Sequence, residues 1–584
     1  MATRLVVGDL TAPRIATAAV VAHAGSSLPA TPESRAVGPF RFRQSPCVTG
    51  QVEIKQWELD HLQSRYSSAP SEEIALTFTE SADPVVGTRT AAHRRLGVLA
   101  VTFMIIAASA PLTVLAGGVT TTFAVTGVLG VPLSFLVLGG TLAIFAVGYA
   151  AMSRYITNAG AFYSYVARGL GRPMGVGVSL VALISYNTMQ IGVYGLFGFQ
   201  VSSLLDSKFG WNVPWWIPVL VCIAIVGILG VNRVDLSAKV LGVLVALEFV
   251  VVIVYDIVSF AVAPEGVTAA PLTPSALFVP GVGAVFAFGI AAFMGFESAA
   301  IYGEESKDPK RTVARATYTA VGIIAIFYAV SSWAMAIGSG PSKIVSDSRT
   351  QGPDLIFSFL SGHVGALMAD IAQLLFVTSI FAALVSFHNA VARYFFSLGR
   401  EGVMPSWLSR IRRHSGAPWA GSLTQTLLAT IVIIGFAIAG AGWTPPKGVP
   451  AELFPVLTLF SWLTNTGAMG LTLLMAIVSF AVIGFFRRNR HGAGAWQRVV
   501  APVISGVALT SVFALIVVYF NTLLTSDPTA PPTVMTYILP ALVIIPGILG
   551  VVWGSVLKRS NPRVYAQIGH GPEEVGAPEL GADG

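Results

Sequence analysis

Long apolar stretches without a charged side chain dominate the chain after residue 95. Nine of them contain no Asp, Glu, Lys or Arg, and they cover 96–153, 173–205, 266–296, 316–342, 371–392, 414–446, 453–486, 499–526 and 528–557. Two more apolar segments lie at 214–231 and 236–263, and the second carries Glu248 and Asp256. Because about 20 apolar residues suffice to cross a bilayer as a helix, the pattern predicts a polytopic α-helical membrane protein.

The first stretch is long enough for two helices, and the glycines at 127 and 130 divide it. This gives twelve predicted spans, which begin near Gly97, Val131, Met174, Pro214, Leu236, Val279, Ala314, Val364, Gly421, Phe454, Gln497 and Met535. A membrane β-barrel would show segments of about ten residues with alternating polarity. The sequence lacks that alternation, so we expect an all-α fold.

Composition and charge agree with this picture. Hydrophobic residues make up 54% of the chain and charged residues only 11%, which excludes an ordinary soluble domain. Of the 25 Lys and Arg after Leu96, 21 fall at one set of span ends and loops, and the other set holds only Lys208, Lys343, Arg349 and Lys447. The positive-inside rule therefore predicts that both termini are cytoplasmic. The net charge of +7 follows from this topology and does not indicate a nucleic-acid partner.

Polar tails flank the predicted spans. Residues 1–95 are rich in Ala, Ser, Pro and Thr and contain no spanning run, which predicts a disordered cytoplasmic tail, and 559–584 predicts a short solvated end. Cys47 lies in the first tail and Cys222 in an apolar span, so no disulfide framework is expected.

Two predicted spans carry residues that interrupt a helix. The first contains Ser-Ala-Pro at 109–111 and a glycine pair at 117–118, and the sixth contains glycines at 281, 283, 289 and 295. Irregular backbone is tolerated at membrane depth only where protein or a water-filled cavity satisfies it. Broken helices in corresponding positions of two halves point to a substrate site of a transporter. A simple proline kink in the first span is the alternative.

The positions of these breaks divide the chain into repeats. We expect spans one to five at 96–263, an inverted repeat of spans six to ten at 264–486, and an added pair at 487–558. The free N–H groups at the start of a half-helix attract a carboxylate, and the carbonyls at the end of one attract an ammonium group. A zwitterionic amino acid carries both groups.

Three motifs resemble those of amino acid permeases of the amino acid/polyamine/organocation (APC) superfamily. They are Ser-Ala-Pro-Leu-Thr-Val-Leu-Ala-Gly from residue 109, Phe-Met-Gly-Phe-Glu-Ser from 293 with the following Glu-Glu-Ser-Lys-Asp-Pro-Lys-Arg-Thr, and Ser-Leu-Gly-Arg-Glu-Gly-Val-Met-Pro from 397. The resemblance covers about 94–563. It implies a LeuT-type 5+5 inverted repeat with two added helices, alternating access, and a substrate held between spans one and six.

The resemblance also implies site residues. Backbone around Ser109, Ala110 and Pro111 would meet the substrate carboxylate, and carbonyls around Ala292, Phe293 and Gly295 the ammonium group. Many relatives have Gly-Ser-Gly where this chain has Ser-Ala-Pro, and proline offers no N–H. The expected substrate-binding set is completed by residues of spans one, three and six, namely Thr113, Gly117, Tyr186, Gln190 and Glu297. Glu297 is either a polar hinge or a structural residue that faces an inner cavity.

Glu248 lies near the middle of the fifth span, where an isolated carboxylate is costly and indicates a function by default. We expect it to exchange protons during transport, with Ser386 of the eighth span, or Ser379, at a cation site. A neutral Glu248 that only bonds a neighbouring helix is the alternative. Asp256 and Asp370 lie nearer the outer helix ends and are expected to be solvated.

The third span carries one polar stripe, in which Tyr186, Gln190 and Tyr194 recur four residues apart. The stripe lines the substrate cavity or forms hydrogen bonds between helices; the pattern leaves both open. His388, near the inner end of span eight, is expected to be solvated.

The sequence therefore predicts a secondary transporter of amino acids or related amines in the cytoplasmic membrane, coupled to protons or sodium or working by exchange. No phosphate-binding loop and no His/Cys cluster with metal-ligand spacing is present, so neither an ATP-driven pump nor a metal or other cofactor is expected. A membrane-embedded enzyme acting on lipid-linked or acyl substrates is the main alternative. A channel is a weaker one, because paired broken helices resemble a closed binding site more than a pore.

Overall fold

The computed structural model describes residues 97–156, 161–232, 238–299, 309–412, 416–446, 448–490, 492–527 and 529–569. The chain divides into two units, Met1–Ala92 and His93–Gly584, and all described residues belong to the second. The tail expected at 1–95 lies outside the described residues, and so does 570–584.

The described part of the chain is helical and contains no strand. Nine of its helical segments are long and apolar enough to cross a membrane, and they centre on α4 (Val131–Met152), α6 (Arg172–Phe209), α8 (Ala238–Val262), α11 (Pro309–Ser339), α14 (Ala366–Arg400), α15 (Trp419–Gly440), α16 (Ser461–Arg488), α17 (Ala501–Val518) and α19 (Val534–Ser560). Three shorter apolar segments are Thr113–Thr126, which joins η1 (Thr113–Val119) to α3 (Thr120–Thr126), α7 (Trp216–Asn232) and α10 (Val282–Phe293). The all-α membrane fold class is confirmed, and the count of twelve spans stays a prediction.

The predicted division between the first two spans is confirmed. Helix α3 ends at Thr126, and Gly127 follows in the left-handed conformation with φ of 65°, where glycine avoids the penalty of a side chain. Helix α4 then begins at Val131 with Pro132 in its first turn, a position at which the missing N–H of proline is harmless.

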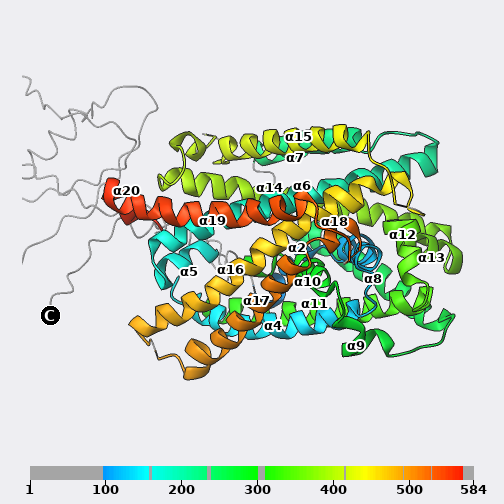
Figure 1. Ribbon diagram of the computed structural model, residues 1–584, viewed down its shortest axis with the longest axis horizontal. Helices are drawn as coiled ribbons and strands as arrows, with labels where there is room; N and C mark the ends of the chain where they lie inside the picture. The colour runs from blue at the N-terminus through cyan, green and yellow to red at the C-terminus, as the bar shows by residue number, and fades with distance from the viewer. Residues whose placement is uncertain are drawn as a thin grey trace, which may run out of the picture. The chain divides into compact units, whose positions relative to one another are not determined.

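Helix α6 is the central helix of the bundle. It packs against α14, α16 and α19, and Figure 1 shows these helices running beside it. Several of its glycines permit close approaches: for example, a Cβ at Gly192 would lie 2.8 Å from the backbone nitrogen of Thr464, and one at Gly195 2.5 Å from the carbonyl oxygen of Pro455. Small residues at such crossings are typical of helix packing in membranes.

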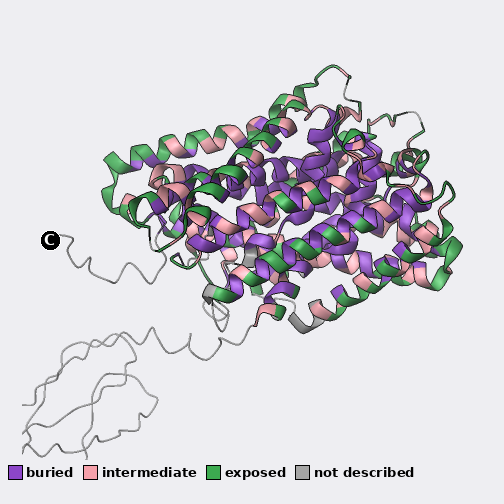
Figure 2. Cartoon of the chain, turned by 90° about the horizontal axis from the view of Figure 1, so that it is seen from below, coloured by how far each residue is buried: buried purple, intermediate pink, exposed green. Residues whose placement is uncertain are grey.

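The outer helices present apolar side chains outward. Figure 2 shows buried residues gathered in the interior of the bundle and exposed residues on its outer helices. On α15 and α19 the exposed positions are mostly aliphatic, among them Ile431, Ile438, Ile548 and Leu549. Since a water-soluble surface would not expose such a continuous apolar face, this surface fits contact with lipid.

Both predicted helix interruptions are present. Helix α2 (Val98–Ser109) ends before Ala110, whose φ of 49° is unusual for a residue with a side chain, and the chain then continues through Pro111 into η1, a π-helical segment. Helix α10 ends at Phe293, and Gly295, with φ of 104°, separates it from the single turn η3 (Phe296–Ala299). The two breaks adjoin, because a Cβ on Gly295 would lie 2.7 Å from that of Ala108.

Several short helices lie between or after the long ones along the chain. They include α5 (Ala161–Gly169), α12 (Ile344–Gln351), α13 (Leu355–His363) and α20 (Pro562–Gln567). The last of these lies in the segment after Arg559, for which a solvated end was expected, and most of its residues are exposed. The Asn561 side chain accepts a hydrogen bond from the Val564 N–H and caps α20, and Ile568 behind it is only 1% exposed. At least 562–569 is therefore ordered against the bundle.

Candidate functional site

A central cavity lies where the two broken helices meet. Its empty space, including its opening to solvent, is about 600 Å³. Its walls come from both breaks and from α3, α4, α6, α14, η8 (Val456–Phe460) and α16, so helices far apart in sequence converge on it.

The cavity wall is apolar and rich in aromatic and methionine side chains. The larger members are Phe135, Met189, Val193, Phe288, Met294, Phe387 and Phe460. Its polar groups are four hydroxyl-bearing residues, Ser109, Thr113, Thr122 and Thr464. None of the described residues that line the cavity carries a formal charge.

Four of the eleven expected substrate-binding residues line this cavity, namely Ser109, Ala110, Thr113 and Ala292. The Ser109 hydroxyl is already engaged, since it donates to the Ile106 carbonyl at 2.8 Å and lies 3.0 Å from the Tyr328 hydroxyl. The Tyr328 hydroxyl also lies 3.5 Å from the Ser109 carbonyl oxygen.

Three other expected residues are buried beside the cavity. Pro111 begins the second half of the first span. Gly117 allows α6 to approach, because a Cβ there would collide with the Leu196 side chain. The Phe293 ring lies against Phe135, with ring centroids 6.4 Å apart.

Glu297 holds the second break together. One carboxylate oxygen accepts the Tyr186 hydroxyl at 2.6 Å, and the other accepts the Gly295 N–H at 2.9 Å. The Tyr149 hydroxyl donates to the Glu297 carbonyl at 3.0 Å, and the Tyr186 ring stacks on Tyr394 at 5.6 Å. Tyr186, Gly295 and Glu297 thus form one buried cluster next to the cavity rather than part of its wall.

Gln190 points away from the cavity, towards α14 and α15. Its amide nitrogen lies 3.3 Å from Nδ1 of His388, and its oxygen accepts from the Gln425 amide at 2.6 Å. His388 Nε2 lies 2.7 Å from the Ser422 hydroxyl. His388 is 1% exposed, so the expectation that it is solvated was wrong: polar partners on neighbouring helices satisfy both ring nitrogens.

The cavity-facing residues of α6 are Met189 and Val193, which the sequence analysis did not single out. They are four residues apart and form one face of the helix, as the polar stripe does on another. No signal in the sequence marked them, because every face of an apolar membrane helix can carry methionine or valine. The same applies to the phenylalanines of the wall.

Glu248 accepts hydrogen bonds at the first helix break. One of its oxygens, Oε2, accepts both the Leu112 N–H and the Ser379 hydroxyl, each at 3.0 Å. The Thr113 hydroxyl donates to the Ser379 oxygen, also at 3.0 Å. Because Thr113 lines the cavity, a chain of hydrogen bonds runs from the cavity wall through Ser379 to Glu248.

Ser386 does not join this chain. It is exposed, and its hydroxyl donates to the Ala382 carbonyl of its own helix at 2.9 Å. Of the two serines considered for the cation site, Ser379 is the one that contacts Glu248.

The two aspartates expected to be solvated differ in their exposure to solvent. Asp370 is exposed and pairs with Lys208 at 2.5 Å. Asp256 is only 8% exposed and accepts the Ser331 hydroxyl at 2.7 Å, so its solvation was wrongly predicted. Helix α11 covers it, which position along α8 alone does not reveal. Among the described residues, no group of three or more His, Cys, Asp or Glu could hold a metal ion.

Comparison with known proteins gives a strong likeness to one family and a weaker likeness to solved structures. The family model described as "Amino acid permease" matches residues 96–546, which is most of the chain and includes both broken helices. The solved structure of MhsT in complex with L-phenylalanine covers 71% of this chain and 98% of its own, at 17% sequence identity and a TM-score of 0.48. No curated protein sequence matches the chain.

Proposed function

Since the chain belongs to the amino acid permease family, we propose that it transports neutral amino acids with apolar side chains by alternating access, coupled to protons. The family membership also makes it a transporter rather than the membrane-embedded enzyme considered above. The single observation that carries the substrate class is the cavity between the two breaks.

The cavity wall favours an apolar substrate side chain. Phe135, Phe288, Phe387 and Phe460 offer ring surface, and Met189 adds an adaptable thioether. A lysine or glutamate side chain in this space would find no opposite charge among the described lining residues, and an unpaired buried charge is costly.

Backbone groups would then bind the ammonium and carboxylate groups of the amino acid. Helix α10 ends at Phe293, so its last carbonyls form a negative dipole end beside the lining residues Ala292 and Met294, suited to an ammonium group. The half-helix that begins at Pro111 presents a positive dipole end suited to a carboxylate.

Glu248 is the proposed proton-coupling residue. When ionised, it receives charge-assisted hydrogen bonds from Leu112 and Ser379, and such bonds are about twice as strong as neutral ones. Protonation weakens both bonds and loosens the second half of the first span from α8 and α14. Through Ser379 and Thr113, the same bonds reach the cavity, so substrate occupancy and protonation affect one another.

The test of the function is uptake of labelled leucine, phenylalanine, lysine and glutamate into proteoliposomes that contain the full-length protein. We expect uptake of leucine or phenylalanine that rises with an inward proton gradient and does not respond to sodium, with lysine and glutamate excluded. If no amino acid or amine shows gradient-sensitive uptake or exchange, the proposed transport function is wrong.

The test of the coupling residue is Glu248→Gln. Glutamine keeps an oxygen for the Leu112 N–H but cannot gain or lose charge, so pH-dependent uptake should disappear while substrate exchange persists. Asp370→Asn is the matched control, because Asp370 is exposed and pairs with Lys208 away from the cavity. If uptake by Glu248→Gln still depends on pH, Glu248 is not the proton-coupling residue.

A further inference from the structure

Asp256 is a second buried carboxyl group on the helix that carries Glu248. Its Oδ2 accepts the Ser331 hydroxyl of α11 at 2.7 Å, whereas its Oδ1 is buried and has no hydrogen-bond partner in the described structure. The hydroxyl groups of Tyr255 and Ser259 beside it are buried as well and lie near each other. Buried polar groups are rarely left unsatisfied, so this cluster calls for a functional explanation.

No cation among the described residues compensates Asp256. Helix α2 carries no charged residue, and on α13 the exposed His363 is bound to the Phe359 carbonyl. Asp370 of α14 is paired with Lys208. The basic residues of α11 and α14 lie many residues from the positions that contact α8, at Lys310, Arg311, Arg315, Arg393 and Arg400.

An ionised Asp256 would therefore be poorly stabilised. Burying an ion costs more free energy than one hydrogen bond to the charged group returns. A carboxyl group in this position binds a proton readily. An ionisable residue inside the membrane with no structural ion pair indicates a function by default.

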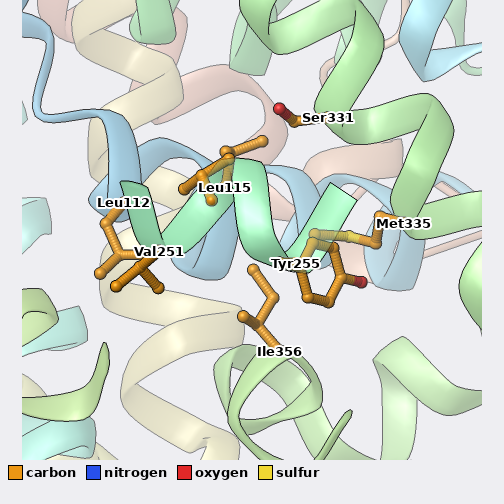
Figure 3. Close-up of a pocket in the computed structure, with 8 residues that line it drawn as sticks. Leu112, Leu115, Val251, Tyr255, Ser331, Met335 and Ile356 are labelled. Carbon is orange, nitrogen blue, oxygen red and sulfur yellow. The ribbon is translucent and has the colours of Figure 1, made fainter. Parts of the chain in front are cut away.

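A narrow apolar cavity, too small to hold a water molecule, lies between the surroundings of the two carboxyl groups. It is lined by Leu112, whose N–H binds Glu248, and by Ser331, whose hydroxyl binds Asp256. Figure 3 shows Leu112 and Val251 on one side of this cavity and Tyr255 and Met335 on the other. Eight residues separate Glu248 and Asp256 along α8, which corresponds to about 12 Å.

We infer that Asp256 is a second proton-binding residue of the transport cycle, which passes protons to and from Glu248 across this cavity. The inference rests on the proton coupling proposed above. Most of the cavity wall is aliphatic or methionine, and apolar cavities of this kind stay dry, so the conformation described here blocks the transfer. Transfer requires hydration of the cavity, which ties proton movement to a change in helix packing and prevents a leak.

The transport test compares Asp256→Asn with the wild-type protein in proteoliposomes, with labelled L-leucine as probe. We expect loss of accumulation driven by a proton gradient, with leucine counterflow unchanged because counterflow needs no net proton movement. Asp256→Glu keeps a titratable group and should restore part of the accumulation, and Asp370→Asn should behave as wild type. Wild-type accumulation in Asp256→Asn would overturn the inference.

An infrared measurement separates this inference from the proposed function. The purified full-length protein is titrated, and the C=O stretch of protonated carboxyl groups is followed in wild type, Asp256→Asn and Glu248→Gln. A component absent only from Asp256→Asn supports a proton on Asp256, even if no amino acid is transported. Identical spectra of wild type and Asp256→Asn overturn the inference, whatever the transport assay gives.

Discussion

Two buried glutamates satisfy backbone groups that the broken helices leave exposed. Glu297 accepts the N–H of Gly295 at the second break, and Glu248 accepts that of Leu112 at the first. Backbone donors at membrane depth must be paired within the protein. Each carboxyl group therefore has a structural role, and at Glu248 this role and the proposed proton coupling use the same bond.

At the second break, Gly295 is expected to tolerate substitution poorly. Its φ of 104° disfavours any side chain, and a Cβ would press on Ala108. Gly295→Ala should therefore destabilise the protein by roughly 1–3 kcal/mol, the usual cost of backbone strain. Thermal unfolding in detergent measures the effect.

Gly322 provides the matched control for that substitution. It lies within α11, it is exposed, and a Cβ there would meet nothing within 4 Å. Gly322→Ala should be neutral or stabilising by at most about 1 kcal/mol, since alanine favours helix. Equal melting temperatures for the two variants would show that Gly295 is not strained.

Among the helices, the segment that follows α19 contacts three other parts of the chain. The Gly569 N–H donates to the Tyr163 hydroxyl of α5 at 2.6 Å and to Glu401, after α14, at 3.4 Å. The Arg172 guanidinium lies over the Tyr565 ring, 5.2 Å from its centroid. Segment 562–569 thus joins α5, the start of α6 and the end of α14.

Docking of this segment should depend on pH through Glu401. Burial raises the pKa of Glu401 to about 8 from its ordinary 4.5, and the hydrogen bond from Gly569 opposes the rise only in part. If undocking returns the carboxyl group to its ordinary pKa, docking is strongest below about pH 4.5, weakens as pH rises, and is weakest above about pH 8. Hydrogen exchange of 562–569 at several pH values measures this.

Glu401→Gln is the control for that prediction. Glutamine retains an acceptor for the Gly569 N–H but does not titrate, so after correction for the intrinsic rate its exchange should no longer vary with pH. A pH profile that matches the wild type would mean that another group controls docking.

For the whole molecule, the distribution of basic residues predicts the orientation in the membrane. The test places single cysteines in a Cys47→Ser, Cys222→Ser background, with Ser346→Cys in a predicted outer loop and Ser406→Cys in a predicted inner one. Both positions are exposed. In intact cells, a membrane-impermeant maleimide should label Ser346→Cys but not Ser406→Cys until the cells are permeabilised. The reverse pattern would contradict cytoplasmic termini.

Features that depend on local chemistry could be predicted from the sequence alone. Apolar runs of spanning length predicted the helices, because each helix satisfies its own backbone in lipid. Glycine at 127 and 295 and proline at 111 marked the turn and both breaks, because backbone freedom is a property of single residues. The isolated charge of Glu248 marked it as a candidate functional residue, and its role in coupling stays a prediction.

Which side chains face one another depends on how the helices pack. In lipid, both the outward and the inward face of a helix are apolar, so hydropathy does not tell them apart. Met189 was therefore not distinguished from its neighbours, and Gln190, His388 and Asp256 received their polar partners only when other helices packed against them. Contacts between residues far apart in sequence, rather than the pattern along any one helix, created the cavity and both proposed proton sites.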